Sequence, residues 1–417
     1  MMRIFNIAVR NLMRYKRRTL LTSMLITLGV TMAILFSGLS GSFKSMMIGR
    51  ITDANLSQIQ IHKNGYVSSM DSVPLNLNLN SKEYAKIDDV LKSNPSVHAW
   101  APRIKLGAML SNYSEATNIR LNAIDPEREV EVCPAVGNRM TFGENDRRKE
   151  LIRPGEVILP DKLAKGMKIR YGDTVVLVAN NKDGSVNGLN FIVAGITETV
   201  VGPQGKEGYM HIKDARTLLR MEQPEITEVA VRLNDFNRLG LVYEDLKSAL
   251  SKFKNKNGKP AFEIHTWEKL SPFYNIARMI DLMSVSMKLI MVSIVLISIL
   301  NVMIMSVYER VREIGTMSAI GTTQGKIMAL FLTEGVTLGL ISIAAGTIIG
   351  LSGIFLLNVY SIRFSFGRND NLLLEPSISF TELFRLAAIV LLISVFASLY
   401  PAYKASKMEP VDALRHV

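Results

Sequence analysis

The sequence predicts an α-helical membrane protein with four transmembrane helices and an α/β extracytoplasmic domain, a split ferredoxin-like subdomain with a mostly β insert. Three observations predict this class. The 417 residues are 48% apolar and only 21% charged, which is too apolar for a disordered chain and unusual for a soluble one. Long uncharged runs lie near the N-terminus and in the last third. Residues 43–280 have the mixed composition of a water-soluble domain.

Four stretches approach or exceed the roughly 20 predominantly apolar residues that a helix needs to cross the hydrocarbon core of a bilayer. The first contains no charged residue between Thr19 and Leu39. The fourth reaches the required length only when residues on both sides of its apolar run are included. We expect the spans at 19–42, 281–307, 327–360 and 381–402, and the range 281–307 includes a stalk ahead of the second span.

Two polar residues lie inside these predicted spans, Asn301 in the second and Glu334 in the third. An ionisable group inside a membrane segment is a candidate functional residue, because placing it in lipid is costly. Pairing with a lysine or arginine near the membrane interface is the simpler role for Glu334. For Asn301 we expect an interhelical hydrogen bond rather than a contact with a substrate.

Basic residues are concentrated in the short segments that flank the spans, and this distribution predicts the orientation of the chain. The flanks hold twelve lysines and arginines against four acidic residues, so they carry most of the net charge of +12. We therefore expect both termini, the 308–326 segment and the 403–417 tail in the cytoplasm. Residues 43–280 and the short loop 361–380 are expected outside. Because the surplus of positive charge follows the topology, binding to nucleic acid is not expected.

The N-terminal segment 1–18 is basic and precedes the first span. Ile4, Ala8 and Leu12 recur on one side of a helix, which predicts an amphipathic helix on the inner membrane surface. A cleaved signal peptide is the alternative, since small residues follow the apolar stretch. That stretch is longer than the roughly 7–15 residues of a signal peptide, so we expect an uncleaved anchor.

Residues 43–280 contain two strand–helix–strand patterns separated by a long insert. The first pattern predicts a strand at 57–61, a helix at 82–93 and a strand at 97–110, and the second a strand at 228–233, a helix at 238–254 and a strand at 261–265. Two such units around an insert predict one split, ferredoxin-like subdomain. Short strands at 155–160, 173–179 and 190–196 make the insert mostly β.

The sequence contains no catalytic constellation. The histidines are scattered, and none has a metal-ligand partner three or four positions away on a helix. Cys133 is the only cysteine, which excludes an intrachain disulfide and favours an inert thiol over a nucleophile. The segment 321–327 resembles a phosphate-binding loop, but it is one residue short, lacks the final Ser or Thr and lies between two spans. We expect neither a metal nor a cofactor in this chain.

The segment 308–335 leaves one span, presents a charged turn, forms a short helix and re-enters the membrane. A charged cytoplasmic helix joined to two spans is suited to docking into another protein and transmitting a movement. The alternative is a solvated loop whose composition reflects only the distribution of basic residues.

Motifs in four regions resemble those of ABC-transporter permeases of the lipoprotein-releasing and macrolide-export superfamily. A pattern that begins in the 308–335 segment and ends at residue 339 matches at Glu309, Arg310, Glu313, Ile314, Gly315, Ala319, Gly321, Ile327, Phe331, Glu334 and Gly339. The tail at 400–415 resembles the family's PAxxAxxxxPxxALR motif, and residues 8–18 resemble its N-terminal opening. Externally, residues 155–178 and 191–196 resemble blocks of the family's periplasmic domain.

The resemblance implies a permease subunit of the bacterial inner membrane with its large domain in the periplasm. Its partners are expected to be a cytoplasmic ABC ATPase dimer, a second permease copy or a paralogue, membrane lipid, a lipoprotein substrate and a periplasmic carrier. ATP and Mg²⁺ are expected in the ATPase, so this chain is not itself an enzyme. The implied ATPase-coupling residues are Glu309, Arg310, Arg312, Glu313, Ile314, Gly315, Ala319 and Gly321.

Extraction of lipoproteins from the inner membrane is the function that the resemblance favours, since the external domain is large and Trp267, Asn275 and Asn301 resemble the pattern of that branch. The lack of an ATPase domain fused to the permease points the same way. Efflux of peptides or small toxic molecules captured in the periplasm is an alternative. A mechanical relay that activates a cell-wall hydrolase is another.

Overall fold

The computed structural model describes residues 7, 10, 11, 14, 16–142, 150–198, 207–360, 363–366 and 369–409. Contacts divide the chain into two compact units. The helical unit comprises Met1–Met46 and Ile276–Val417, and the α/β unit comprises Met47–Asn275. Most of the predicted interfacial helix at 1–18, and the tail from 410 onward, lie outside the described residues.

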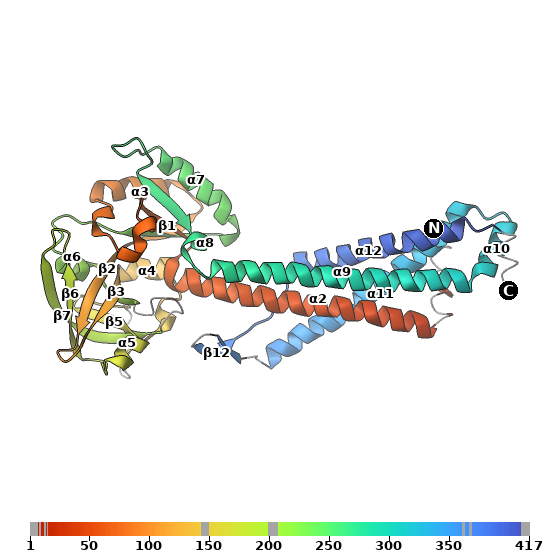
Figure 1. Cartoon of the computed structure of the whole chain (residues 1–417), viewed down its shortest axis with the longest axis horizontal. Helices are drawn as coiled ribbons and strands as arrows, with labels where there is room; N and C mark the ends of the chain where they lie inside the picture. The colour runs from red at the N-terminus through yellow and green to blue at the C-terminus, as the bar shows by residue number, and fades with distance from the viewer. Residues whose placement is uncertain are drawn as a thin grey trace. The chain divides into compact units, whose positions relative to one another are not determined.

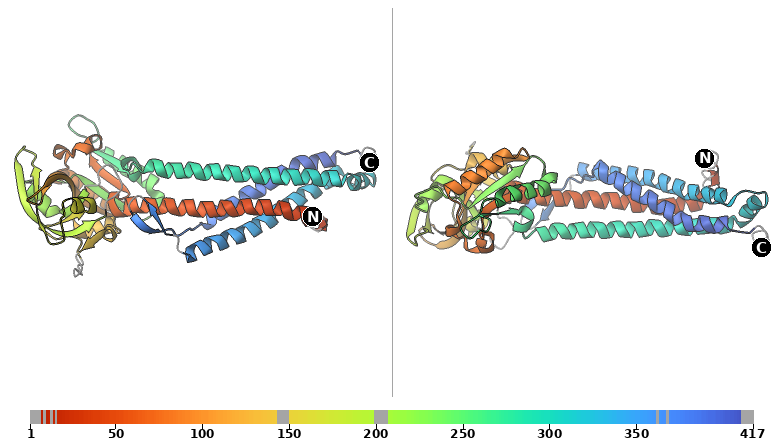
Figure 2. Two further views of the ribbon diagram at one scale, coloured as in Figure 1. Left: turned by 60° about the horizontal axis from the view of Figure 1, so that its bottom comes forward. Right: turned by 90° about the horizontal axis from the view of Figure 1, so that it is seen from above.

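The helices that are long and apolar enough to cross a membrane number four among the described residues, as predicted. They are α2 (Lys16–Ile51), α9 (Tyr274–Glu309), α11 (Gln324–Val359) and α12 (Phe380–Ser406), shown in Figures 1 and 2. The first three have 36 residues each, about 54 Å at 1.5 Å per residue. α2 and α9 therefore extend well past the apolar runs from which their spans were predicted, whereas α11 nearly coincides with its predicted span, 327–360. No proline interrupts α2 or α9, so both helices continue beyond their uncharged segments.

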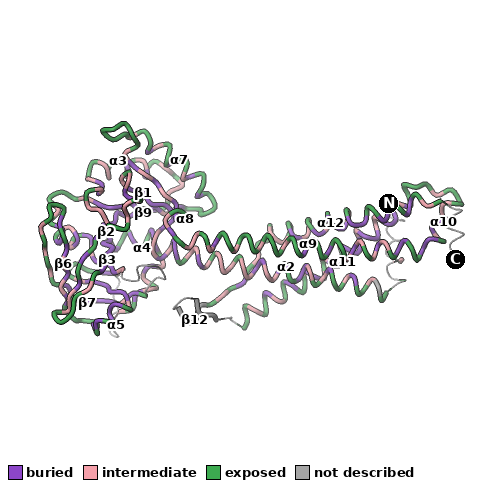
Figure 3. Tube along the Cα trace, in the orientation of Figure 1, coloured by how far each residue is buried: buried purple, intermediate pink, exposed green. Residues whose placement is uncertain are grey.

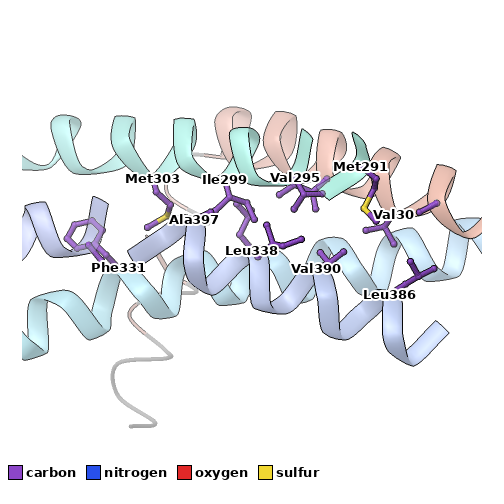
Figure 4. Close-up of a cluster of buried hydrophobic side chains, with 14 of the residues drawn as sticks. Val30, Met291, Val295, Ile299, Met303, Phe331, Leu338, Leu386, Val390 and Ala397 are labelled. Atoms are coloured by element: carbon purple, nitrogen blue, oxygen red, sulfur yellow. The ribbon is translucent and has the colours of Figure 1, made fainter. Parts of the chain in front are cut away.

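The core of the helical unit is a continuous cluster of buried apolar side chains from all four long helices. Figure 4 shows side chains of α9 facing those of α11 and α12 across this cluster, among them Ile299, Leu338 and Val390. Figure 3 shows that burial is confined to the inward faces, while the outward faces are exposed. Because these outward faces are also apolar, the helices are suited to lie in lipid.

Glycines of α11 allow close contact with two different helices along its length. Gly335 and Gly339 lie against Ser398 and Ser394 of α12. Gly346, further along, lies against Val30 of α2. Without a hydrophobic effect between helices in lipid, such close backbone approach is a main source of helix association. The first half of α11 is therefore held to α12 and the second half to α2.

Replacing Gly346 with alanine is expected to destabilise the helical unit by about 1–3 kcal/mol, because the new Cβ would lie 2.7 Å from the Cβ of Val30 and 3.0 Å from the carbonyl oxygen of Thr27. This cost exceeds the roughly 0.5–1 kcal/mol that alanine gains over glycine inside a helix. Gly325→Ala on the same helix is the matched control, since its Cβ would meet no atom within 4 Å. Thermal unfolding in detergent should show a lower Tm for Gly346→Ala only, and equal Tm values would contradict this packing.

The segment predicted as a short loop at 361–380 contains a pair of antiparallel strands, β11 (Arg363–Phe366) and β12 (Asn369–Leu373). The sequence analysis missed this hairpin. Its strands have only four and five residues, too few for an alternating pattern to be distinguished from loop.

The α/β unit contains the predicted split ferredoxin-like arrangement. Its elements are β1 (Ile59–Lys63), α3 (Ser81–Ser93), β2 (Val97–Ser111), β9 (Glu228–Leu233), α7 (Leu239–Ser251) and β10 (Phe262–Thr266). The strands lie in the order β10-β1-β9-β2, with every neighbouring pair antiparallel. The two helices lie side by side on this sheet (Figure 1). A capping box formed by Asn80 and Glu83 fixes the start of α3.

The β insert continues the same sheet and closes on itself. Its strands are β3 (Ala116–Ile124), β5 (Glu156–Pro160), β6 (Thr174–Asn180), β7 (Val186–Thr197) and β8 (Glu207–His211), with the short β4 (Met140–Phe142) paired to β7. Hydrogen-bonded neighbours run β2-β3-β8-β5-β7-β6 and back to β2. Closure into a barrel leaves these six strands without a free edge.

The fifteen-residue β2 belongs to both halves, because residues 97–103 pair with β9 and residues 103–111 pair with β3.

Short helices complete the unit: α4 (Pro126–Val132), α5 (Asp161–Gly166), α6 (Ile212–Leu218), α8 (Trp267–Leu270), a π-helical turn at Thr52–Leu56 and 3₁₀ turns at Val67–Ser72, Leu75–Leu77, Gly137–Arg139 and Phe236–Arg238. The external domain was predicted at 43–280, and both of these ends lie inside the long helices α2 and α9. The compact α/β unit, Met47–Asn275, is a few residues shorter at each end than this predicted domain.

Candidate functional site

The short helix α10 (Val311–Ala319) joins α9 to α11 in the segment whose sequence predicted a docking helix. Arg310 separates α9 from α10 and interrupts the continuous helix with φ −115° and ψ 19°. At the other end Gly321 has φ +89°, a left-handed conformation that favours glycine. These two residues fix α10 as a separate helix between two long ones.

Arg310 is the centre of an ionic network at this junction. Its Nη1 donates to Oε1 of Glu334 on α11 at 2.7 Å, and its Nε donates to Oε2 of Glu313 on α10 at 2.9 Å. The side chains of Arg310 and Glu334 are almost fully buried, and the guanidinium lies over the ring of Phe331. Glu334 therefore pairs with a basic residue, as expected, but the pair is buried inside the protein.

The N-terminal segment joins the same network through two of its described residues, Asn11 and Arg14. Asn11 Nδ2 donates to Oε1 of Glu334 at 2.7 Å, and Arg14 Nη1 donates to Oε1 of Glu313 at 2.9 Å. Four parts of the chain thus meet here, namely the N-terminal segment, the α9–α10 junction, α10 and α11. A displacement of α10 must break or carry along these contacts.

The charges of the network reinforce each other. A hydrogen bond from Arg310 holds the pKa of the Glu313 carboxyl below its usual range, although partial burial opposes this. Burial acts against the charge of Arg310, but Glu334 and Glu313 raise the pKa of its guanidinium above the usual value. Arg310 and Glu313 are therefore both charged at neutral pH.

The predicted coupling residues divide between two faces of this segment. Arg310, Ile314 and Gly315 are buried against the helical unit, and Glu313 is half-buried. Exposed residues on the other side are Glu309, Arg312, Ala319 and Gly321. Ile320, which the sequence analysis did not single out, is 77% exposed. Ile320 therefore adds an apolar side chain to the exposed residues of this segment.

A second contact that the sequence analysis missed holds the end of α9 to α12. Lys404 Nζ donates to the hydroxyl oxygen of Tyr308 at 3.0 Å and lies over its ring. The last turn of α9 is therefore held on one side by α12 and on the other by Arg310 and α11.

Asn301 does not make the interhelical hydrogen bond that was expected. Its side chain is exposed on α9 and has no hydrogen bond to any residue that the structure describes. The expectation was wrong for a single chain because this face of α9 points away from α11 and α12. The core-facing residues Val295 and Ile299 lie on the opposite side of the helix.

The α/β unit contains a separate buried ionic cluster around Arg103. Its guanidinium donates to both oxygens of Glu129, at 2.6 and 3.0 Å, and to Glu228 at 3.1 Å. Lys105 and His62 also contact Glu228, at 2.8 and 3.2 Å. Burial alone would raise the pKa of Glu228, but Lys105, His62 and Arg103 hold it well below its usual range.

Cys133 lies beside this cluster with its Sγ 3.1 Å from Arg103 Nη2. Burial raises the pKa of its thiol to about 12, although Arg103 opposes the shift. A buried, neutral thiol is unreactive, which agrees with the expected inert cysteine. Among the described residues, no group of three His, Cys, Asp or Glu side chains could hold a metal ion.

Two family models match this chain. The MacB-like periplasmic core domain matches residues 19–249, more than half of the chain, and the FtsX-like permease C-terminal model matches residues 285–410. The lipoprotein-releasing system transmembrane protein LolC of Neisseria meningitidis is 24% identical over 94% of this chain and 92% of its own length. LolE of Haemophilus influenzae is 23% identical over 79% and 80%.

The macrolide export ATP-binding/permease protein MacB of Nitrobacter winogradskyi is 24% identical over 95% of this chain but only 58% of its own length. The solved periplasmic region of MacB from Actinobacillus actinomycetemcomitans is 14% identical to this chain. The match covers 53% of this chain and 92% of that structure, with a TM-score of 0.36. The two family models and the relatives that match nearly the whole chain agree. The chain belongs to the family of four-span ABC-transporter permeases with a MacB-like periplasmic core domain, and is a multi-pass inner-membrane permease of the LolC, LolE and MacB type.

Proposed function

We propose that this permease uses the movement of a cytoplasmic ATPase dimer to extract lipoproteins from the inner membrane and to pass them to a periplasmic carrier. The observation that carries the proposal is the network in which Arg310 joins the half-buried Glu313 of α10 to the buried Glu334 of a membrane span. The relatives named as lipoprotein-releasing proteins, among them one matched over 92% of its length, support this cargo.

In this proposal the ATPase binds the exposed face of α10. The contact residues are Ile320 and the exposed members of the predicted set, Glu309, Arg312, Ala319 and Gly321. The buried members, Arg310, Ile314 and Gly315, act inside the permease and carry the movement to α9 and α11. ATP and Mg²⁺ are bound by the ATPase, a separate subunit, so the permease contributes docking and transmission rather than hydrolysis.

The proposed orientation places both termini and α10 in the cytoplasm and the α/β unit in the periplasm. Its support is the concentration of basic residues in the N-terminal segment and around α10 and the end of α12. Membrane lipid surrounds the outward faces, and a second permease, a copy or a paralogue, completes the complex.

Efflux of peptides or toxic molecules is the second candidate. A macrolide exporter matches 95% of the length of this chain, and its sequence identity to the chain equals that of LolC. Depletion of the protein separates the two. Lipoprotein extraction predicts that acylated proteins accumulate in the inner membrane. Efflux predicts drug sensitivity with normal lipoprotein sorting, and normal sorting on depletion would contradict the primary proposal.

Replacing Ile320 with glutamate is expected to weaken binding of the ATPase by at least about thirtyfold, the effect of losing an apolar contact worth about 2 kcal/mol at an interface centre. Co-purification of the ATPase with the tagged permease from membranes measures this. Leu241→Glu, at a residue of α7 that is 67% exposed, is the matched control. Unchanged co-purification of the Ile320→Glu variant would exclude this face as the docking site.

A further inference from the structure

The α/β unit contains a cavity of about 300 Å³. It is lined mainly by the last residues of α2, the π-helical turn that follows them, the segment 66–73, strands β2, β3 and β8, and residues 270–273 before α9. All of these residues belong to the same compact unit. Pockets that bind small molecules have volumes of roughly 300–1,000 Å³, so this cavity is large enough for a small ligand.

A row of polar side chains crosses three strands at this cavity. Lys105 on β2 is paired with Asn122 on β3, and Asn122 is paired with Tyr209 on β8. Paired residues on neighbouring strands place their side chains on the same face of a sheet, and so do residues two positions apart on one strand. Arg120 on β3 therefore lies on this face as well, and all four residues line the cavity. The charge of Lys105 is offset by Glu228, 2.8 Å away.

Two buried tyrosines, Tyr66 and Tyr209, also line the cavity. The ring of Tyr66 is stacked on that of His62, with 5.1 Å between the ring centroids, and its hydroxyl has no hydrogen-bond partner among the described residues. Leaving a buried hydroxyl unpaired is unfavourable, so a ligand atom that bonds to it is favoured. Burial raises the pKa of both tyrosines, so both hydroxyl groups stay protonated and can donate to an oxygen anion.

Two arginines at the cavity, Arg50 and Arg139, form no ion pair with a carboxylate among the residues that the structure describes. Arg139 donates instead to the backbone oxygens of Ala54 and Glu198, at 2.9 and 2.8 Å. These bonds fix the position of its guanidinium but leave the charge uncompensated. Arg50 is exposed at the end of α2.

The acidic residues at the cavity do not cancel this positive charge. The side chain of Asp71 is 98% exposed and Glu198 is also exposed, so water screens both carboxylates. Glu207 is the partly buried acid, and it is outnumbered by the partly buried Arg120 and Arg139. The buried side of the cavity therefore favours an anion.

The hydrogen-bond donors lie on different walls of the cavity, with Tyr209 on β8, Tyr66 in the segment 66–73 and Arg139 beside the π-helical turn. Donors that come from several directions suit a tetrahedral phosphate better than a planar carboxylate. We propose that this cavity binds the phosphate group of a phospholipid headgroup or of a small phosphate ester. Arg50 and Arg139 pair with its charge, the two tyrosines donate to its oxygens, and Phe273 contacts its carbon chain. The proposal depends on neither the cargo nor the docking of the ATPase.

Two binding assays on the full-length protein in dodecyl maltoside, a detergent without phosphate, distinguish the two sources of this group. In the first, radiolabelled sn-glycerol 3-phosphate is added and its binding is measured by equilibrium dialysis. In the second, delipidated protein is incubated with phosphatidylglycerol, and the lipid retained per chain is counted by mass spectrometry. Saturable binding of the ester identifies a soluble ligand. Retention of one more phosphatidylglycerol molecule per chain than in the cavity variants identifies a headgroup. Binding in neither assay would overturn the proposal.

Tyr66→Phe is the sharpest variant, because it removes only a hydroxyl that has no partner within the described protein. It should therefore not lower the Tm without ligand. We expect it to weaken binding at least tenfold, the effect of losing a hydrogen bond to a charged group. Tyr171→Phe, at a tyrosine that is 42% exposed outside the cavity, is the matched control and should leave binding unchanged. Equal binding by Tyr66→Phe and the unsubstituted chain would overturn the proposal.

Arg50→Met tests the charge independently. Arg50 is exposed, so its replacement does not disturb the core, and this variant remains decisive if Tyr66→Phe fails to fold. We expect about fivefold weaker binding, the effect of losing one exposed ion pair. Arg170→Met, at an exposed arginine outside the cavity, is the control and should bind as the unsubstituted chain does. Equal binding by the two arginine variants would contradict the proposed site.

Discussion

Replacing Arg103 with methionine is expected to destabilise the α/β unit by about 3–5 kcal/mol. The substitution leaves Glu129 and Glu228 buried without the guanidinium that contacts both. Breaking a buried ion pair by removing one partner is costly in this range, because the remaining charge stays uncompensated. Lys105 still contacts Glu228, but no other basic side chain among the described residues is bonded to Glu129.

Cys133 provides the measurement. It is the only cysteine and is fully buried beside Arg103, so it can be alkylated only when the unit opens. We expect the alkylation rate in the full-length protein to rise by roughly two to four orders of magnitude, since every 1.4 kcal/mol is about tenfold.

Arg232→Met is the matched control, because Arg232 forms a partly exposed ion pair with Asp53 that is worth about 1 kcal/mol or less. Equal alkylation rates in the two variants would show that the Arg103 cluster adds no more stability than a surface pair.

Replacing Arg310 with methionine is expected to abolish the transmission of nucleotide-driven movement while leaving the ATPase bound. Arg310 is buried and away from the exposed face of α10, so docking should persist. Its loss disconnects α10 from Glu334 on α11. In the complex reconstituted with the ATPase, we expect the ATP-dependent change in hydrogen exchange at residues 274–290 to fall at least tenfold.

A double substitution separates transmission from simple stability. Arg310→Met alone leaves Glu334 buried with only the amide of Asn11, which costs about 3–5 kcal/mol. Arg310→Met combined with Glu334→Leu removes both charges, and replacing a buried pair by apolar groups is often neutral or stabilising. Thermal stability should therefore recover in the double variant, whereas the ATP-dependent exchange should not. Recovery of both would mean that the pair serves only to hold the fold.

Much of the fold could be predicted from local pattern. The β1–α3–β2 and β9–α7–β10 units were predicted because their strands alternate and their helices have a 3.6-residue period, and the split ferredoxin-like order follows from their repetition. Closure of the barrel could not be predicted, because it depends on β6 reaching β2, a pairing between residues far apart in the chain. The lengths of α2 and α9 were underestimated because hydropathy detects only the apolar, lipid-facing part of a helix. It does not detect where the helix continues outside the membrane.

The candidate site was only partly accessible to the sequence. Charge inside a span identified Glu334, and the motif identified Arg310, but their pairing depends on a turn of the chain between α9 and α11 that no periodicity encodes. Ile320 was missed because a single isoleucine at a helix end is ordinarily buried. The contact of Asn11 with Glu334 joins residues more than three hundred positions apart, and only the folded bundle brings them together.

The first and last strands of the α/β unit, β1 and β10, are hydrogen-bonded neighbours, with Ile59 opposite Thr266. The chain therefore enters and leaves this unit at adjoining points, as in domains that tolerate transplantation into a loop of another protein. An α/β unit attached in this way is an interchangeable module. Another domain with the same spacing of its two ends can replace it without a change in the helices that carry it.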